Sequence, residues 1–224
     1  MRRATARFSA LVCAGVLLVA VVASPAHAAP IVNQPANGPL NRISQDFTDF
    51  SNFSSYEFDD FTTAAAYLLT TLTVYGVEQG DSSQNVAVTA QIWNGLPGSG
   101  SIVLSANGAQ VGSDLQFNFG NQLLGPGSYW LTAFVTRSFS VGGQWFWNEN
   151  VPVTGSAAYF YNPGGGFGCG TSPVNGSVCP FGYEANMAFV LEGNLAPVPE
   201  PASLSLLGMG LLGGFAWRRR AVKQ

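Results

Sequence analysis

Carboxylates are the reactive side chains that the central part of this 224-residue chain offers in number. Residues 29–199 hold eleven aspartates and glutamates, and a glycoside hydrolase needs two carboxylates about 5–10 Å apart. The closest neighbours, Asp59 and Asp60, would point to opposite faces of a strand, so they cannot act as one pair. The same residues contain no histidine and no lysine, which removes the usual base of a Ser or Cys triad and Schiff-base chemistry. We therefore expect no catalytic residues, with a carboxylate-dependent glycoside hydrolase as the less favoured alternative.

Aspartates are also the candidate ligands of a structural calcium ion, because Ca²⁺ takes about six to eight oxygen ligands from carboxylates, carbonyls and water. The candidates are Asp46, Asp49, Asp59, Asp60 and Asp81. Their spacing matches no EF-hand loop, so a solvated acidic face is the competing interpretation. Apart from this calcium ion, the sequence indicates no cofactor.

Trp145 and Trp147 carry the one specific binding hypothesis. On a strand they share a face, with Phe146 opposite. Two exposed indole rings about 7 Å apart could stack on successive sugar rings, as in a carbohydrate-binding module. The competing interpretation places both rings in the core, because large aromatic side chains contribute heavily to the cores of small β-domains. The solvent exposure of the two rings decides between these interpretations.

Cys169 and Cys179 are the two cysteines of residues 29–199. In an exported chain a disulfide between them is expected. Two thiols without a histidine do not complete a zinc site, so metal binding is the weaker interpretation. The bridge would close a loop, residues 170–178, that is rich in Gly, Pro and Ser.

Short β-strands separated by turns must position these side chains. Alternating apolar residues predict strands at 86–92 and 115–119, and residues 129–135 are apolar on both faces, which predicts a central strand. Asn107-Gly108 is predicted to be a hairpin turn. About eight to ten strands at such spacing predict an all-β fold, an antiparallel β-sandwich that is jelly-roll-like.

The order of these segments also resembles a family of secreted bacterial jelly-roll domains. The segments that carry the resemblance are YEFDDFTT (56–63), LTTLTVYG (69–76), VAVTAQIWNGLPGSG (86–100), GPGSYWLTAFV (125–135) and GQWFW (143–147). The resemblance spans residues 47–193 and implies a fold, but it supplies no catalytic residues.

Residues 1–28 have the pattern of a secretory signal peptide. A basic start precedes an apolar stretch at 8–23, which we expect to form the signal helix. Ala26, Ala28 and Ala29 define an A-x-A cleavage site, and signal peptidase would cut before Ala29.

The C-terminus combines a short motif, an apolar run and a basic end. The motif is Pro199, Glu200 and Pro201, the apolar run is residues 204–217, and the basic end begins with Arg218, Arg219 and Arg220. This arrangement closely resembles the PEP-CTERM tail, the proposed recognition signal for exosortases in Gram-negative bacteria that make exopolysaccharide. The resemblance implies export through the inner membrane, processing by an exosortase-like enzyme and delivery to the cell surface or exterior. As a helix, the apolar run would rise roughly 21 Å against a hydrocarbon core of about 30 Å, and an ordinary C-terminal anchor helix is the alternative.

The expected organisation has six parts. They are a signal peptide (1–28), a leader (29–45), a β-sandwich domain (46–194), a Pro-rich linker with the PEP motif (195–203), a transmembrane-like sorting segment that forms an apolar helix (204–217) and a basic cytoplasmic tail (218–224).

Seven of the nine basic residues belong to the two targeting segments, which leaves Arg42 and Arg137 in residues 29–199 and a net charge of about −9 there. Such a surface cannot neutralise phosphates, so a nucleic-acid partner is excluded. The sequence therefore predicts a non-catalytic, exported protein of the cell surface or of an extracellular exopolysaccharide (biofilm) matrix. A carbohydrate-binding module, with exopolysaccharide as partner, is the alternative.

Overall fold

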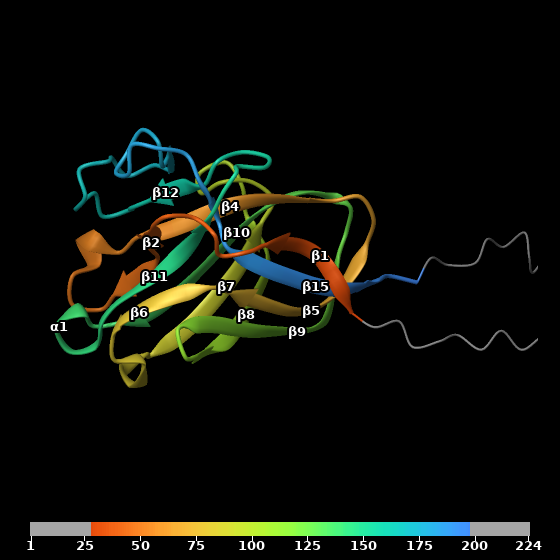
Figure 1. The fold of residues 1–224 in the computed structure, drawn as a ribbon, viewed down its shortest axis with the longest axis horizontal. Coiled ribbons are helices and arrows are strands. Elements are labelled where there is room, and N and C mark those ends of the chain that lie inside the picture. Colours follow the sequence, from red (N-terminus) through yellow and green to blue (C-terminus); the bar gives the residue numbers. More distant parts are fainter. Residues whose placement is uncertain (1–27, 198–224) are drawn as a thin grey trace, which may run out of the picture.

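The computed structural model describes residues 28–197, which form an all-β fold (Figure 1). The strands are β1 (Ala29–Gln34), β2 (Asn41–Ile43), β3 (Gln45–Phe47), β4 (Tyr56–Thr63), β5 (Tyr67–Val74), β6 (Gly76–Gly80), β7 (Ala87–Trp93), β8 (Ile102–Val111), β9 (Asp114–Leu124), β10 (Gly127–Arg137), β11 (Gly143–Asn150), β12 (Tyr159–Tyr161), β13 (Val174–Asn175), β14 (Asn186–Met187) and β15 (Phe189–Leu195). The short helices are η1 (Ser51–Phe53), η2 (Ser82–Gln84) and α1 (Phe139–Gly142).

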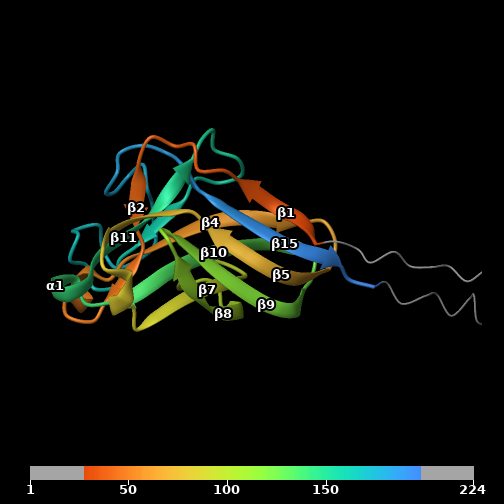
Figure 2. The same ribbon diagram turned by 60° about the horizontal axis from the view of Figure 1, so that its bottom comes forward.

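Two sheets enclose one main core. The larger sheet has the order β1-β15-β5-β9-β8-β7-β10-β4-β12-β13, and β3 joins it parallel to β10. The smaller sheet has the order β14-β11-β2, with β6 also paired to β11. The larger sheet curls, as Figure 2 shows, so that buried residues of β5, β9 and β15 pack in one cluster with those of β4, β7, β10 and β11. The predicted all-β, antiparallel sandwich is confirmed, and the jelly-roll strand order stays a prediction.

The central strand is β10, as the sequence indicated. It pairs with β4 on one side and with β7 on the other. Leu131, Ala133 and Val135 are buried in the core, while Thr132 and Phe134 project from the opposite face of the sheet. β10 is therefore apolar on both faces because one face packs in the main core and the other packs on the opposite side of the sheet.

The predicted leader is wrong, because residues 29–45 contribute strands to both sheets. Ala29 pairs with Gly193 of β15, and Ile31 and Val32 pack against the main core. The Pro- and Asn-rich composition of the segment concealed this pairing, which depends on a strand more than 150 residues away.

The predicted turn at Asn107-Gly108 is also wrong. β8 continues through both residues, and the chain turns at Gly112, whose φ is +64°. A Cβ at position 108 would lie 2.3 Å from the carbonyl oxygen of Gln116. Glycine is therefore required at this position by the close approach of the β9 backbone rather than by a turn.

Both ends of the described chain leave the fold at the same place. β1 and β15 are neighbours, and they meet the grey traces at the right of Figure 1, while α1 lies at the opposite end. Within residues 28–197 no helix is long and apolar enough to cross a membrane. Outside the described residues lie positions 1–27 of the signal peptide and the whole of the PEP motif, the 204–217 segment and the basic tail.

Candidate functional site

Trp145 and Trp147 do not form a sugar-binding platform. They share a face of β11 as predicted, but both rings are 0% exposed in the main core. The indole nitrogen of Trp145 donates to the carbonyl oxygen of Ser113 at 2.7 Å, and that of Trp147 donates to Ala188 at 2.8 Å. Because the N–H groups have these internal partners, the rings are buried without an unsatisfied donor. The platform prediction is wrong, and the core interpretation is correct for these two residues.

The five candidate calcium ligands do not converge on one site. Within residues 28–197 no three His, Cys, Asp or Glu side chains are placed to hold a metal ion. Each candidate accepts hydrogen bonds from the protein instead: Asp46 from Ser54, Asp49 from Ser138, Phe139 and Ser140, Asp59 from Met187, Asp60 from Ser156, and Asp81 from Ser83. These carboxylates therefore serve as hydrogen-bond acceptors for neighbouring backbone and side-chain groups.

The pKa values of these aspartates separate into two groups. Desolvation would raise the pKa of Asp49, but hydrogen bonds from the start of α1 hold it well below its usual range. The hydrogen bonds from Ser83 lower the pKa of Asp81. Asp59 is fully buried, and desolvation raises its pKa well above the ordinary value. Desolvation also raises the pKa of its neighbour Asp60, which lies on the other face of β4.

The predicted disulfide between Cys169 and Cys179 is present, with their Cα atoms 5.7 Å apart. It closes the glycine-rich segment that follows β12. Cys169 and Val174 from this segment pack against a small second core of Ile43, Phe47 and Phe160. The bridge therefore holds an irregular segment against the fold.

Replacing Cys169 with serine is expected to lower the free energy of unfolding by about 2.5–3 kcal/mol, because without the bridge the unfolded chain regains the conformational entropy of the short loop. Urea denaturation of the oxidised protein measures the change. The matched control replaces Cys169 and Cys179 together, which removes the free thiol. Unchanged midpoints in both variants would mean that the bridge does not contribute to stability.

A buried ionic network, which no local sequence pattern predicts, connects three strands. Arg42 of β2, Glu57 of β4 and Glu149 of β11 are all 0% exposed. The Nε of Arg42 donates to Oε1 of Glu149 at 2.8 Å, and its Nη1 lies 4.0 Å from Oε2 of Glu57. The guanidinium also lies over the rings of Phe181 and Tyr183, 4.5 and 5.3 Å from their centroids. Arg42 thus holds the segment before β14 on the smaller sheet.

Glu57 is the least satisfied member of this network. Neither of its carboxyl oxygens makes a hydrogen bond within the described residues. Desolvation raises its pKa to about 8, while Arg42 lowers the pKa and Glu149 raises it. Glu57 therefore stays largely protonated at neutral pH. Glu57 and Glu149 are brought together by the fold as a carboxyl pair, but their burial keeps both away from any polymeric substrate.

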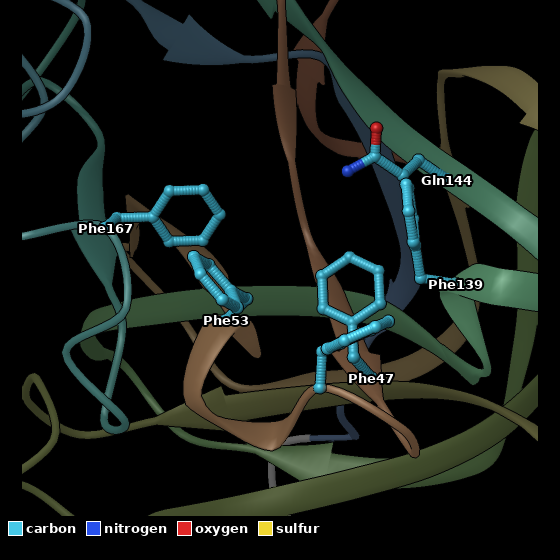
Figure 3. Close-up of a pocket in the computed structure, with 6 residues that line it drawn as sticks. Phe47, Phe53, Phe139, Gln144 and Phe167 are labelled. Atoms are coloured by element: carbon cyan, nitrogen blue, oxygen red, sulfur yellow. The ribbon is translucent and has the colours of Figure 1, made fainter.

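Five phenylalanines surround a hollow near α1, here called the Phe pocket (Figure 3). The pocket has a volume of about 270 Å³, and its lining is Phe47, Phe50, Phe53, Phe139, Phe167 and Gln144. Phe53 and Phe167 form an edge-to-face pair with centroids 5.4 Å apart, and Phe47 and Phe139 form another at 6.0 Å. Phe139 is 46% exposed although its ring is apolar.

The Phe pocket can accommodate an apolar group but has no acid or base among its lining side chains. Gln144 supplies the one polar lining side chain. The regular spacing of Phe47, Phe50 and Phe53 was a signal that sequence reasoning missed. Phe139 and Phe167 come from distant parts of the chain, and their approach depends on the fold.

Comparison with known proteins identifies the C-terminal segment. Residues 197–220 match the sequence model of the PEP-CTERM protein-sorting motif. No curated protein matches the chain. The matched residues include Pro199-Glu200-Pro201, the apolar run and the three arginines that follow it. The chain therefore combines an all-β, sandwich-like domain with a C-terminal PEP-CTERM sorting motif.

Proposed function

We propose that this protein is exported and sorted by an exosortase-like enzyme to the surface or exterior of a Gram-negative bacterium. There it serves as a non-catalytic component of an exopolysaccharide-rich matrix. The observation that carries the proposal is the PEP-CTERM motif at residues 197–220. The signal-peptide pattern of residues 1–28 supports export by the same route.

The arrangement of the chain ends supports a display role. β15, which leads to the sorting motif, lies beside β1 at one end of the fold (Figure 1). The Phe pocket is built partly from α1, which lies at the other end. A protein held through its C-terminus would therefore present the Phe pocket away from the membrane.

The chemistry of the described residues supports a role without turnover. The paired carboxyls of Glu57 and Glu149 are enclosed, and the Phe pocket has no titratable lining residue. The net charge of about −9 in residues 29–199 favours solubility and discourages association between copies.

Replacing Pro199, Glu200 and Pro201 with alanine is expected to abolish C-terminal processing in a host with an exosortase. The wild-type chain should lose its tail, while the variant should keep residues 204–224 and remain in the membrane fraction. Mass spectrometry of both termini measures this outcome. Ser203→Ala, beside the motif, is the matched control and should be processed normally. Normal processing of the triple variant would contradict the proposal.

A further inference from the structure

A second aromatic surface lies on the face of the larger sheet opposite the main core. Thr132 of β10 is directly opposite Gln91 of β7, and Trp130 is opposite Trp93. Across the other edge of β10, the antiparallel register that pairs Leu131 with Asp59 brings Phe58 and Tyr56 of β4 alongside Thr132 and Phe134. Tyr161 of β12 in turn pairs with Tyr56. The strands therefore place aromatic and polar side chains from four segments on one face.

We call this surface the aromatic face and define it by six residues. They are Tyr56, Gln91, Trp93, Thr132, Phe134 and Tyr161, which line one hollow of about 260 Å³. Phe58, Pro97 and Pro163 complete its lining.

The rings of the aromatic face are held in place by one another. Tyr56 packs edge-to-face on Phe134 with centroids 4.8 Å apart, and it lies 6.1 Å from Tyr161. Phe58 is buried beneath them and contacts Trp93 and Tyr161 at centroid distances of 5.8 and 6.3 Å. Because packing fixes these rings before a ligand arrives, little conformational entropy is lost on binding.

Thr132 supplies an unexplained polar group in this hollow. The residue is 1% exposed, and its hydroxyl oxygen has no hydrogen-bond partner within residues 28–197. A buried hydroxyl without a partner is costly, and because Thr132 lines the hollow, a ligand that reaches this hydroxyl would supply the missing partner.

Gln91 and Tyr56 add further hydrogen-bonding capacity. The Oε1 of Gln91 accepts from the indole nitrogen of Trp93 at 3.1 Å, which leaves the amide N–H groups of Gln91 as donors. Burial and the nearby carboxylate of Asp46 raise the pKa of Tyr56, and because its hydroxyl proton is directed at Asp46, the oxygen is left as an acceptor. The hollow thus combines ring faces with hydroxyl and amide groups, whereas the Phe pocket has Gln144 as its one polar lining side chain.

We propose that the aromatic face binds the pyranose rings of a neutral polysaccharide. A pyranose presents C–H groups on its ring face, which pack on the negative face of an aromatic ring, and hydroxyls around its edge that can pair with Thr132 and Gln91. The glycan is neutral because the domain carries a net charge of about −9 and its two arginines, Arg42 and Arg137, are buried against carboxylates elsewhere. This inference goes beyond the proposed function and holds whether or not the C-terminal motif is processed.

Isothermal titration calorimetry of the full chain tests the proposal, in a detergent without a sugar headgroup. The probes are neutral hexasaccharides of β-1,4-linked glucose, α-1,4-linked glucose and β-1,4-linked mannose, and an acidic hexamer of β-1,4-linked mannuronate. At least one neutral probe is expected to bind, at least tenfold more tightly than the acidic one. Absence of heat with all three neutral probes at about 10 mM, well above the dissociation constants of weak complexes, overturns the proposal. Equal binding of the acidic hexamer also overturns it.

Thr132→Val is the decisive variant because it keeps the shape of the side chain and removes only the hydroxyl. Its affinity for the neutral probe is expected to fall about tenfold, the value of one hydrogen bond, with no loss of thermal stability. Trp93→Ala should weaken binding at least as much. Phe139→Ala removes an exposed ring from the Phe pocket and is the matched control, with unchanged affinity. Unchanged binding in Thr132→Val, or equal loss in Phe139→Ala, shows that the aromatic face is not the site.

Discussion

Replacing Arg42 with methionine is expected to lower the free energy of unfolding by about 3–5 kcal/mol, because it leaves Glu149 buried without its partner. The hydrogen bond from Arg42 to Glu149 would disappear, together with the packing of the guanidinium on Phe181 and Tyr183. Since a typical domain has about 5–15 kcal/mol of stability in total, this one change would bring the fold close to its limit.

Two further variants separate charge from packing at Arg42. Arg42→Met combined with Glu149→Leu removes the buried pair together, and it should recover at least half of the loss, because apolar replacement of a whole buried pair is often neutral. Arg137→Met should cost less than Arg42→Met, because its partner Glu78 is 15% exposed and water can solvate the carboxylate left behind. Urea denaturation curves measure all three. A double variant no more stable than Arg42→Met would contradict a burial penalty as the cause.

Much of the fold was predictable because period-two patterns reflect local geometry. The alternation around residues 86–92 and 115–119 became β7 and β9, and the doubly apolar segment 129–135 became the centre of β10. The disulfide was predictable because its cysteines lie only 10 positions apart in an exported chain. In each case the information lies within a short stretch of sequence.

The aromatic residues show what period-two patterns do not predict. Alternation places Trp145 and Trp147 on one face of a strand, but it does not say which face meets the core. The structure buries these two rings and leaves Trp93 on the partly open aromatic face. The sequence signal for the aromatic face was the second apolar face of residues 129–135. Thr132, within that segment, contributes the buried hydroxyl of this face.

The composition of residues 29–45 is that of a linker, and it conceals the strand β2 that carries Arg42. Its partner Glu149 is 107 positions away, and no local pattern relates the two residues. An arginine in an acidic domain suggests a buried ion pair only after its strand has been located in the fold. Buried ion pairs of this kind depend on the tertiary fold, so the spacing of residues in the sequence does not predict them.

The stability of the described domain is expected to be greatest near pH 4–5 and to fall by several kcal/mol toward pH 8. Glu57 has a pKa of about 8 in the folded protein against 4.5 ordinarily. Between these values the folded state holds a proton that the unfolded state has released, so unfolding becomes easier as the pH rises, by about 1.4 kcal/mol per unit at most. Asp59 acts in the same direction, because its pKa is raised as well. Asp49 and Asp81 have lowered pKa values, and their contribution is lost as the pH falls below about 4.

Urea denaturation from pH 3 to 9 with the disulfide intact measures this profile, and Glu57→Gln identifies its main source. Glutamine resembles the protonated carboxyl but cannot ionise, so the variant should lose much of the decline between pH 5 and 8 while keeping the acid limb set by Asp49 and Asp81. Asp60→Asn is the matched control, since Asp60 also lies on β4 but is only partly buried and should change the slope little. A decline that persists unchanged in Glu57→Gln would mean that this carboxyl is already ionised in the fold and that Arg42 outweighs its desolvation. Because the network holds together the strands around Arg42, that result would also raise the expected cost of Arg42→Met.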